Sequence, residues 1–185
     1  LDSNSIDFDD LLMNARSLLE NCPEVLGLYQ NLFRYINVDE WQDTNRAQYV
    51  LVSLLAAKYR NLAVVGDDAQ AIYSWRGADF RNITDFEKDW PDAKVIMLDQ
   101  SYRSTQIVLD AAKSVISRNI LQKEKNLWTE KKSGDPISLV AAADERAEAE
   151  FVFTSIRDLM RQGRALKDIV VLYRTNAQSR ALEET

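Results

Sequence analysis

The sequence predicts an α/β protein in which parallel sheets are flanked by helices. Short apolar runs typical of buried strands alternate with segments whose apolar residues recur at helical spacing. Polar clusters directly follow several of these runs, and ligands of parallel sheets gather at the carboxyl ends of strands. Charge is uneven, with a net of −8 over residues 1–100 and +2 over residues 101–185, so we expect the two halves to face different surroundings.

The helices are indicated by apolar periodicity and by their end signals. Pro23 suits the first turn of a helix, the polar loop before residue 46 ends in capping residues, Ser104 is expected to cap another helix, and Gly163 closes a long one. In chain order, we expect helices at residues 8–19, from Pro23, at 47–55, 80–89, 107–116 and 145–162, and at the C-terminal end.

The strands are short apolar runs, each bounded by polar or glycine-containing turns. The run that ends at Val65 is stopped by Gly66, and the run that ends at Leu98 is stopped by Asp99. In chain order, we expect strands at residues 35–38, 62–65, 95–98, 137–140 and 169–173.

Composition excludes several classes of function. The chain has no histidine, which removes His-dependent triads and HExxH zinc sites, and its one cysteine, Cys22, cannot form an internal disulfide and is expected to pack between helices. No glycine is followed by lysine, so a GxxxxGK[ST] phosphate loop is absent from this sequence. The longest apolar run, residues 139–143, is too short to span a membrane.

Three polar clusters carry candidate chemistry. In the first, Asp39 and Glu40 follow a predicted strand, where one carboxylate can hold a magnesium-bound water and the other can activate an attacking water. An acidic, solvated loop is the alternative, and these two residues alone favour it. The first cluster is therefore informative only in combination with the others.

The second cluster is the stretch from Gly66 to Gly77. If this loop is extended, Tyr73 and Trp75 point the same way as two parallel rings that could stack unpaired bases, with Arg76 on a phosphate. Gln70 could orient a phosphate oxygen or a water. Burial of both aromatics in the core is the alternative, which their polar neighbours weaken.

The third cluster is residues 100–104, just before a predicted helix. Arg103 could neutralise charge on a phosphoryl group, and Tyr102 offers a flat face to a purine. An arginine salt-bridged near the start of a helix is an equally good interpretation of this cluster alone.

Together the clusters carry a resemblance to a family. The sequence resembles the UvrD/Rep/PcrA helicases of superfamily 1A in the segments DFDDLL (7–12), DEWQDTN (39–45), VGDD (65–68), QAIYSWRGAD (70–79), YRST (102–105) and VLYRTNAQSR (171–180). The resemblance runs over nearly the whole chain, with several long motifs in order and at the family's spacing.

The resemblance implies ATP-driven 3′-to-5′ movement on single-stranded DNA and unwinding of 3′-tailed duplexes, in repair or replication. It implies two parts of RecA-like motor lobes, residues 1–99 from the first and 100–185 from the second. By motif position, the resemblance implies that Asp39 holds Mg²⁺, Glu40 activates the attacking water and Gln70 senses the γ-phosphate. It implies that Tyr102 packs on the adenine and that Arg103 contacts the γ-phosphate. The residues it places on DNA are Tyr73, Trp75 and Arg76, with Arg174 and Asn176 as weaker candidates for contact with the DNA backbone.

The chain is expected to be an internal piece, because it begins at Leu1, stops at Thr185 inside a predicted helix and lacks the phosphate loop. Its partners are then DNA and the remaining segments of the same helicase, in a bacterial, nucleoid-associated cytoplasmic setting with no membrane. We expect the fragment alone to be inactive. Two alternatives remain for the parent: a helicase–nuclease recombination subunit, or a catalytically dead DNA-binding module.

Overall fold

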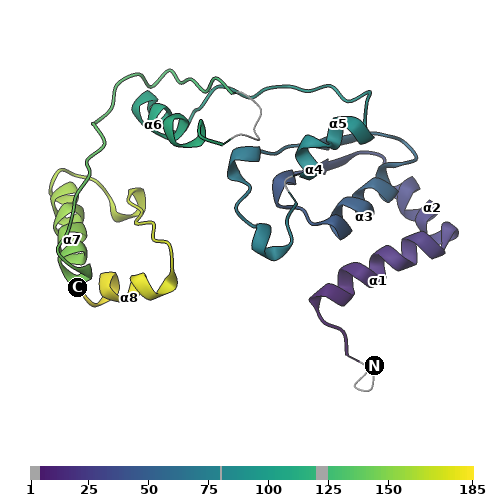
Figure 1. Ribbon diagram of the computed structural model, residues 1–185, viewed down its shortest axis with the longest axis horizontal. Helices are drawn as coiled ribbons and strands as arrows, with labels where there is room; N and C mark the ends of the chain where they lie inside the picture. The colour runs from purple at the N-terminus through teal and green to yellow at the C-terminus, as the bar shows by residue number, and fades with distance from the viewer. Residues whose placement is uncertain (1–4, 80, 120–124) are drawn as a thin grey trace. The chain divides into compact units, whose positions relative to one another are not determined.

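The computed structural model describes residues 5–79, 81–119 and 125–185, and the chain divides into two compact units, Leu1–Gly134 and Asp135–Thr185 (Figure 1). The elements of the first unit are α1 (Phe8–Asn21), α2 (Pro23–Leu32), β1 (Ile36–Val38), the 3₁₀ helix η1 (Trp41–Asp43), α3 (Arg46–Ala56), β2 (Leu62–Val64), the 3₁₀ helices η2 (Asp68–Gln70) and η3 (Ser74–Arg76), α4 (Arg81–Thr84), α5 (Phe86–Asp89) and α6 (Gln106–Ile116). Those of the second are α7 (Glu145–Arg161), the 3₁₀ helix η4 (Leu166–Asp168) and α8 (Asn176–Glu184).

The two described strands form a parallel pair. Ile36 lies opposite Leu62 and Val38 opposite Val64, and α3 makes the crossover between the strands. Both α2 and α3 pack against α1, beside the sheet (Figure 1). The α/β class and the parallel pairing are therefore as the sequence predicts.

The core of the first unit lies where the two strands end. Trp41 is fully buried, and its indole N–H donates to the carbonyl of Asn82 at 2.9 Å. Its ring lies 5.5 Å from that of Tyr49 and 6.0 Å from that of Phe86, centroid to centroid. The buried Asn82 amide donates in turn to the carbonyl of Thr44 at 2.9 Å, so α4 and α5 are fixed over η1.

The helix signals were good guides to helix starts. Pro23 occupies the first turn of α2, and Asn45 caps α3 through a reciprocal capping box with Gln48. The expected cap at Ser104 is wrong by one residue, because Thr105 is the N-cap of α6 and the Ser104 N–H donates to the hydroxyl of Ser101 instead.

One predicted helix is broken. The single helix expected at residues 80–89 is instead α4 and α5, because the chain turns at Asp85; Phe80 lies outside the described residues. Each short helix presents a different residue to Trp41, Asn82 from α4 and Phe86 from α5. Packing around the indole has overridden the local helical pattern.

Three predicted strands, at residues 95–98, 137–140 and 169–173, are wrong: the structure assigns no strand to these ranges. Strand formation requires a neighbouring strand to complete the hydrogen-bonded ladder, and an apolar run does not supply one. In the second unit the side chain of Leu139 is 99% exposed and that of Leu172 is 86% exposed, so these two apolar side chains are largely unpacked.

In the second unit, α7 packs against α8, and Ala149 is its buried apolar residue within the described range. Asp144 caps α7 by accepting the Ala147 N–H at 2.8 Å, and Gly163 follows its end with φ +90°. None of the helices in the described ranges combines the length and apolar character needed to cross a membrane.

Candidate functional site

The ends of β1 and β2 open at the same edge of the sheet. The Val65 N–H donates to the Val38 carbonyl at 2.8 Å, and the Trp41 N–H donates to the Val65 carbonyl at 2.9 Å. These bonds extend the pairing of β1 and β2 by one residue, and the pairing ends there. Asp39 and Glu40 therefore leave the sheet beside Gly66, as expected for neighbouring parallel strands.

Glu40 has an unusual backbone. Its φ of 51° and ψ of 45° are left-handed, a conformation that costs a non-glycine residue about 1–3 kcal/mol. The turn is supported by the side chain of Asp39, which accepts the Glu40 N–H at 2.9 Å. The side chains of both residues are exposed where β1 ends.

A buried amide connects Glu40 to the next loop. Gln42 is 1% exposed, its Nε2 donates to Oε2 of Glu40 at 2.6 Å, and its Oε1 accepts the Asp67 N–H at 3.0 Å. Gly66 makes room for it: a Cβ there would lie 2.9 Å from Oε1 of Gln42. The two predicted clusters are thus joined by one side chain.

Asp67 extends the network to Gln70. Its carboxylate accepts Nε2 of Gln70 at 2.8 Å and the Ala69 N–H at 3.0 Å, which fixes the 3₁₀ turn η2. Burial by itself raises the pKa of Asp67, but hydrogen bonds from Lys125 and Gln70 outweigh it and hold the pKa below its ordinary value. Asp67 is therefore a stable anion between Gln42 and Gln70.

Lys125 lies against the same turn. Its ammonium pairs with Asp67 at 2.5 Å and with Asp68, whose side chain is 5% exposed. Burial lowers the pKa of Lys125, and its hydrogen bonds to the two carboxylates raise it more, so the ammonium form is favoured. No motif in the sequence marks this lysine.

The third cluster is held by the chain around Trp128. The Ser101 N–H donates to the Trp128 carbonyl at 2.8 Å, and the Trp128 N–H donates to the Asp99 carbonyl at 3.0 Å. The segment from Lys125 to Lys131 therefore contacts both the Asp67–Asp68 turn and the 100–104 loop.

Tyr102 and Arg103 are exposed on that loop. The Tyr102 side chain is 76% exposed, and its hydroxyl donates to Oε1 of Gln100 at 2.9 Å. The Arg103 carbonyl accepts from the ammonium of Lys131 at 3.2 Å, and the Arg103 side chain forms no ion pair within the described residues. The described residues therefore give no support to the alternative in which Arg103 forms a salt bridge.

The two aromatics of the second cluster lie at the surface. Trp75 is 72% exposed and Tyr73 is 38% exposed, which argues against the core interpretation. The condition for parallel rings, an extended loop, is not met, because Ser74–Arg76 forms η3. The ring planes meet at 51° with centroids 6.4 Å apart. The side chain of Arg76 lies outside the described part of the chain.

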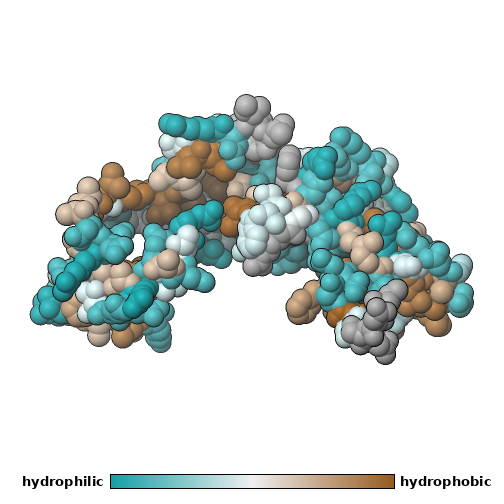
Figure 2. All heavy atoms as spheres, turned by 60° about the horizontal axis from the view of Figure 1, so that its bottom comes forward, coloured by the Kyte–Doolittle hydropathy of each residue, from teal (hydrophilic) through white to brown (hydrophobic). Residues whose placement is uncertain are grey.

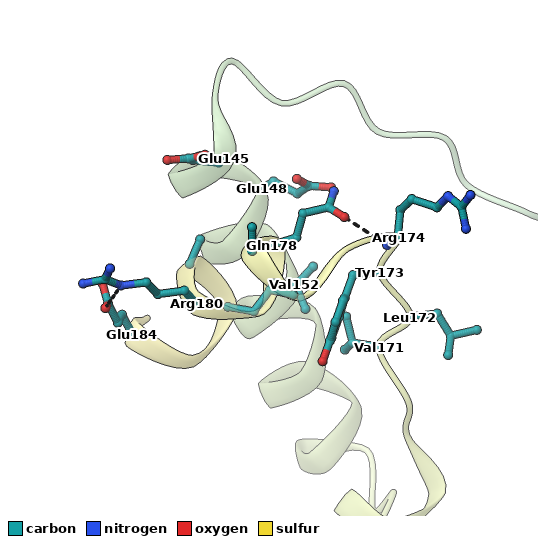
Figure 3. Close-up of a pocket in the computed structure, with 13 residues that line it drawn as sticks. Glu145, Glu148, Val152, Val171, Leu172, Tyr173, Arg174, Gln178, Arg180 and Glu184 are labelled. Carbon is teal, nitrogen blue, oxygen red and sulfur yellow. Dashed lines mark hydrogen bonds and ion pairs between the residues drawn. The ribbon is translucent and has the colours of Figure 1, made fainter. Parts of the chain in front are cut away.

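Arg174 and Asn176 belong to the second unit. Oε1 of Gln178 accepts the backbone N–H groups of Arg174 and Thr175, each at 2.9 Å, and Asn176 begins α8. Figure 3 shows the Arg174 side chain extending away from α7 and α8, at the rim of a hollow of about 690 Å³. The backbone here is a helix cap, and the Arg174 guanidinium extends outside it.

The structure therefore brings Asp39, Glu40 and Gln70 to one edge through Gln42 and Asp67, which sequence reasoning missed as site residues. Gln42 could have been found from its place inside the DEWQDTN motif, whereas Lys125 had no signal. An exposed carboxylate such as Asp39 suits Mg²⁺, which takes one or two protein carboxylates and keeps its waters. The described residues hold no cluster of three or more acidic, histidine or cysteine side chains that would bind a metal by themselves.

Comparison with known proteins gives two family matches that together cover almost the whole chain. Residues 1–91 match the UvrD/REP helicase N-terminal domain, and residues 96–185 match the UvrD-like helicase C-terminal domain. The expected division at 99/100 is not tested by these matches or by the two compact units, and stays a prediction.

Similar curated proteins are named ATP-dependent DNA helicase PcrA. The protein of Staphylococcus aureus (strain NCTC 8325 / PS 47) is 55% identical over 183 residues, and that of Staphylococcus epidermidis (strain ATCC 12228 / FDA PCI 1200) is 54% identical over 183 residues. Each alignment covers 99% of this chain and 25% of the relative, so the chain spans about a quarter of the length of these proteins. The chain belongs to the UvrD-like helicase family and is PcrA-like in sequence.

Proposed function

We propose that this chain is the central part of a longer ATP-dependent DNA helicase that moves 3′-to-5′ on single-stranded DNA and unwinds 3′-tailed duplexes in repair or replication. The observation that carries the proposal is the hydrogen-bonded series from Glu40 through Gln42 and Asp67 to Gln70. The series connects the Glu40 carboxylate, which can activate water, with the Gln70 amide, which can hydrogen-bond a phosphate oxygen. A motor driven by ATP hydrolysis requires both functions.

In this proposal each exposed group has one task. Glu40 orients and deprotonates the attacking water, Gln70 contacts the γ-phosphate, and Arg103 neutralises charge on the transferred phosphoryl group from the second lobe. Tyr102 packs on the adenine. Asp39 would hold Mg²⁺, which when bound neutralises charge on the phosphate oxygens.

The DNA track is proposed to run past the exposed aromatics. Tyr73 and Trp75 form a surface on which unpaired bases can stack, and Arg76 follows them in the chain. Arg174 and Asn176 are proposed to contact the DNA backbone from the second unit. The net charge of −6 is compatible with a motor that must release its track repeatedly, because weak long-range attraction favours release. The proposed setting is the bacterial cytoplasm, in association with the nucleoid.

The proposal is tested in the longer protein by ATP hydrolysis with and without single-stranded DNA. Glu40→Gln should lower DNA-stimulated kcat by about 10²–10⁴-fold because it removes the base. An active Glu40→Gln protein contradicts the assignment, and a wild-type protein that binds DNA without hydrolysing ATP favours the DNA-binding module instead. Strand displacement from 3′-tailed but not 5′-tailed duplexes tests the direction.

The isolated chain provides a separate test. It carries no GxxxxGK[ST] loop to cradle the phosphates, so we propose that it has no appreciable DNA-stimulated ATPase activity by itself. Turnover by the isolated chain close to that of a complete helicase would contradict this.

A further inference from the structure

Gln42 is the buried polar side chain closest to the proposed chemistry. Both ends of its amide are used: Nε2 donates to the Glu40 carboxylate at 2.6 Å, and Oε1 accepts the Asp67 N–H at 3.0 Å. It is 1% exposed, and its side chain extends from η1 to the Gly66–Asp67 backbone, which approaches its oxygen closely. The proposed function gives this residue no task in the hydrolysis step itself.

We propose that Gln42 is a positioning residue for ATP hydrolysis, which holds the Glu40 carboxylate in place and ties it to the Asp67–Gln70 turn. This inference rests on the proposed role of Glu40. An exposed glutamate samples many rotamers, and a hydrogen bond from a packed amide restricts it. Movement of the turn that carries Gln70 is then transmitted to Glu40 through two hydrogen bonds.

The position requires an amide, because one end must donate to a carboxylate and the other must accept from a backbone N–H. Glutamate at 42 retains an acceptor for Asp67 but loses the donor to Glu40 and sets two carboxylates against each other. Gln42→Glu therefore removes the Glu40 contact with little change in side-chain volume. Gln48 offers a matched control. Its Oε1 accepts the Asn45 N–H at the start of α3, and a glutamate oxygen can accept the same bond.

The experiment measures DNA-stimulated ATP hydrolysis by the longer protein carrying Gln42→Glu or Gln48→Glu. We expect kcat of Gln42→Glu to fall about 10–100-fold, because small displacements of a reacting group have effects of this size. KM for ATP should stay within about threefold, since ground-state binding is untouched. Gln48→Glu should match the wild type in both constants.

Non-additivity separates positioning from a general structural effect. In a Glu40→Gln background, Gln42→Glu should lower the remaining kcat by less than about twofold, because the group it positions is gone. Circular dichroism and thermal unfolding establish folding; if Gln42→Glu does not fold, Gln42→Asn, which keeps the amide but shortens its reach, is measured with the same expectation.

Three results would overturn the inference: an unchanged kcat in a folded Gln42 variant, an equal loss in Gln48→Glu, or a full additional loss in the Glu40→Gln background. In each of these the wild type is active and Glu40→Gln is impaired, so the proposed function stands. An inactive wild type, or an active Glu40→Gln protein, instead removes the proposed function itself.

Discussion

The region where β1 and β2 end differs sharply from the second unit, although both contain apolar runs followed by polar motifs. At the strand ends Trp41 is fully buried and Gln42 is 1% exposed, whereas in the second unit Leu139 is 99% exposed and Leu172 is 86% exposed. Brown apolar patches that emerge among hydrophilic residues are visible on the surface in Figure 2. Both regions contain apolar side chains, but Leu139 and Leu172 lack the close packing that surrounds Trp41.

An apolar sequence pattern and burial of the side chains that carry it are therefore separate requirements. In the first unit residues of α3, α4 and α5 converge on the indole of Trp41. In the second unit α7 and α8 pack together, but residues 169–173 have no ladder partner among the described residues. We therefore expect substitutions at the strand ends to cost much more stability than comparable ones in the second unit.

The largest effect is expected from Trp41→Ala. Removal of a fully buried indole and its hydrogen bond to Asn82 should lower the free energy of unfolding of the first unit by about 3–5 kcal/mol. Phe153→Ala, in the second unit, removes a ring that is 50% exposed and should cost under about 1 kcal/mol. Urea unfolding followed by circular dichroism measures both losses, and losses of similar size would contradict this expectation.

Next in size is Lys125→Met, which should cost about 1.5–3 kcal/mol at pH 7 because it leaves Asp67 and Asp68 without their ammonium partner. The pKa of Asp67 is lowered in the folded protein, so its ionic contribution is present above the ordinary value of 3.8 and is lost as pH falls below it. The gap between wild type and variant should therefore shrink in acid. A gap that widens in acid would contradict this; Lys88→Met, at an exposed pair, should have no measurable effect.

Gly66→Ala tests how closely the strand ends are packed, because it adds a single methyl group there. The added Cβ would lie 2.9 Å from both the Gln42 oxygen and the Ile83 Cδ1, so we expect a loss of about 1–3 kcal/mol from overpacking. Gly27→Ala meets nothing within 4 Å, in a helix without buried residues, and should instead stabilise by up to about 1 kcal/mol. Thermal unfolding of both variants provides the measurement, and opposite signs are the expected result.

The smallest effect is expected from Tyr49→Phe. The buried Tyr49 hydroxyl donates to Asp89, and the variant should lose about 0.5–1.5 kcal/mol at neutral pH. Burial, followed by the hydrogen bond and charge of Asp89, raises the pKa of Tyr49 from 10.0 to about 12. The stabilisation is therefore complete below pH 10 and is lost between pH 10 and 12.

Tyr59→Phe is the control for that substitution, since the Tyr59 hydroxyl donates to Asn31 at the surface over 3.3 Å. It should leave the free energy of unfolding at neutral pH unchanged. An equal loss in the two variants would mean that burial of Tyr49 has no energetic consequence.

The sequence was sufficient for the α/β class, the parallel strand pair and the helix starts at Pro23 and Asn45, because these depend on local periodicity and capping chemistry. It was insufficient where tertiary partners decide the outcome. The helix expected at 80–89 is split around Trp41, and three predicted strands lack neighbours. The pattern of residues cannot specify either event.

The candidate site divides in the same way. Asp39, Glu40 and Gln70 were identified from motifs, and their common edge follows from parallel strands. The connection through the Gln42 amide, the Lys125 ion pairs and the left-handed Glu40 backbone depends on exact placement of chain segments far apart in the sequence. The parallel arrangement of Tyr73 and Trp75 depended on an extended loop, and the structure has a 3₁₀ turn there instead.

The most direct test is a crystal structure of the longer protein with Mg²⁺ and a non-hydrolysable ATP analogue. We predict that Gln70 and Arg103 both contact the γ-phosphate and that Asp39 binds the metal. Glu40 should face the water that lies in line with the phosphorus and keep its hydrogen bond to Gln42. A nucleotide bound elsewhere, with Glu40, Gln70 and Arg103 on separate faces, would contradict it.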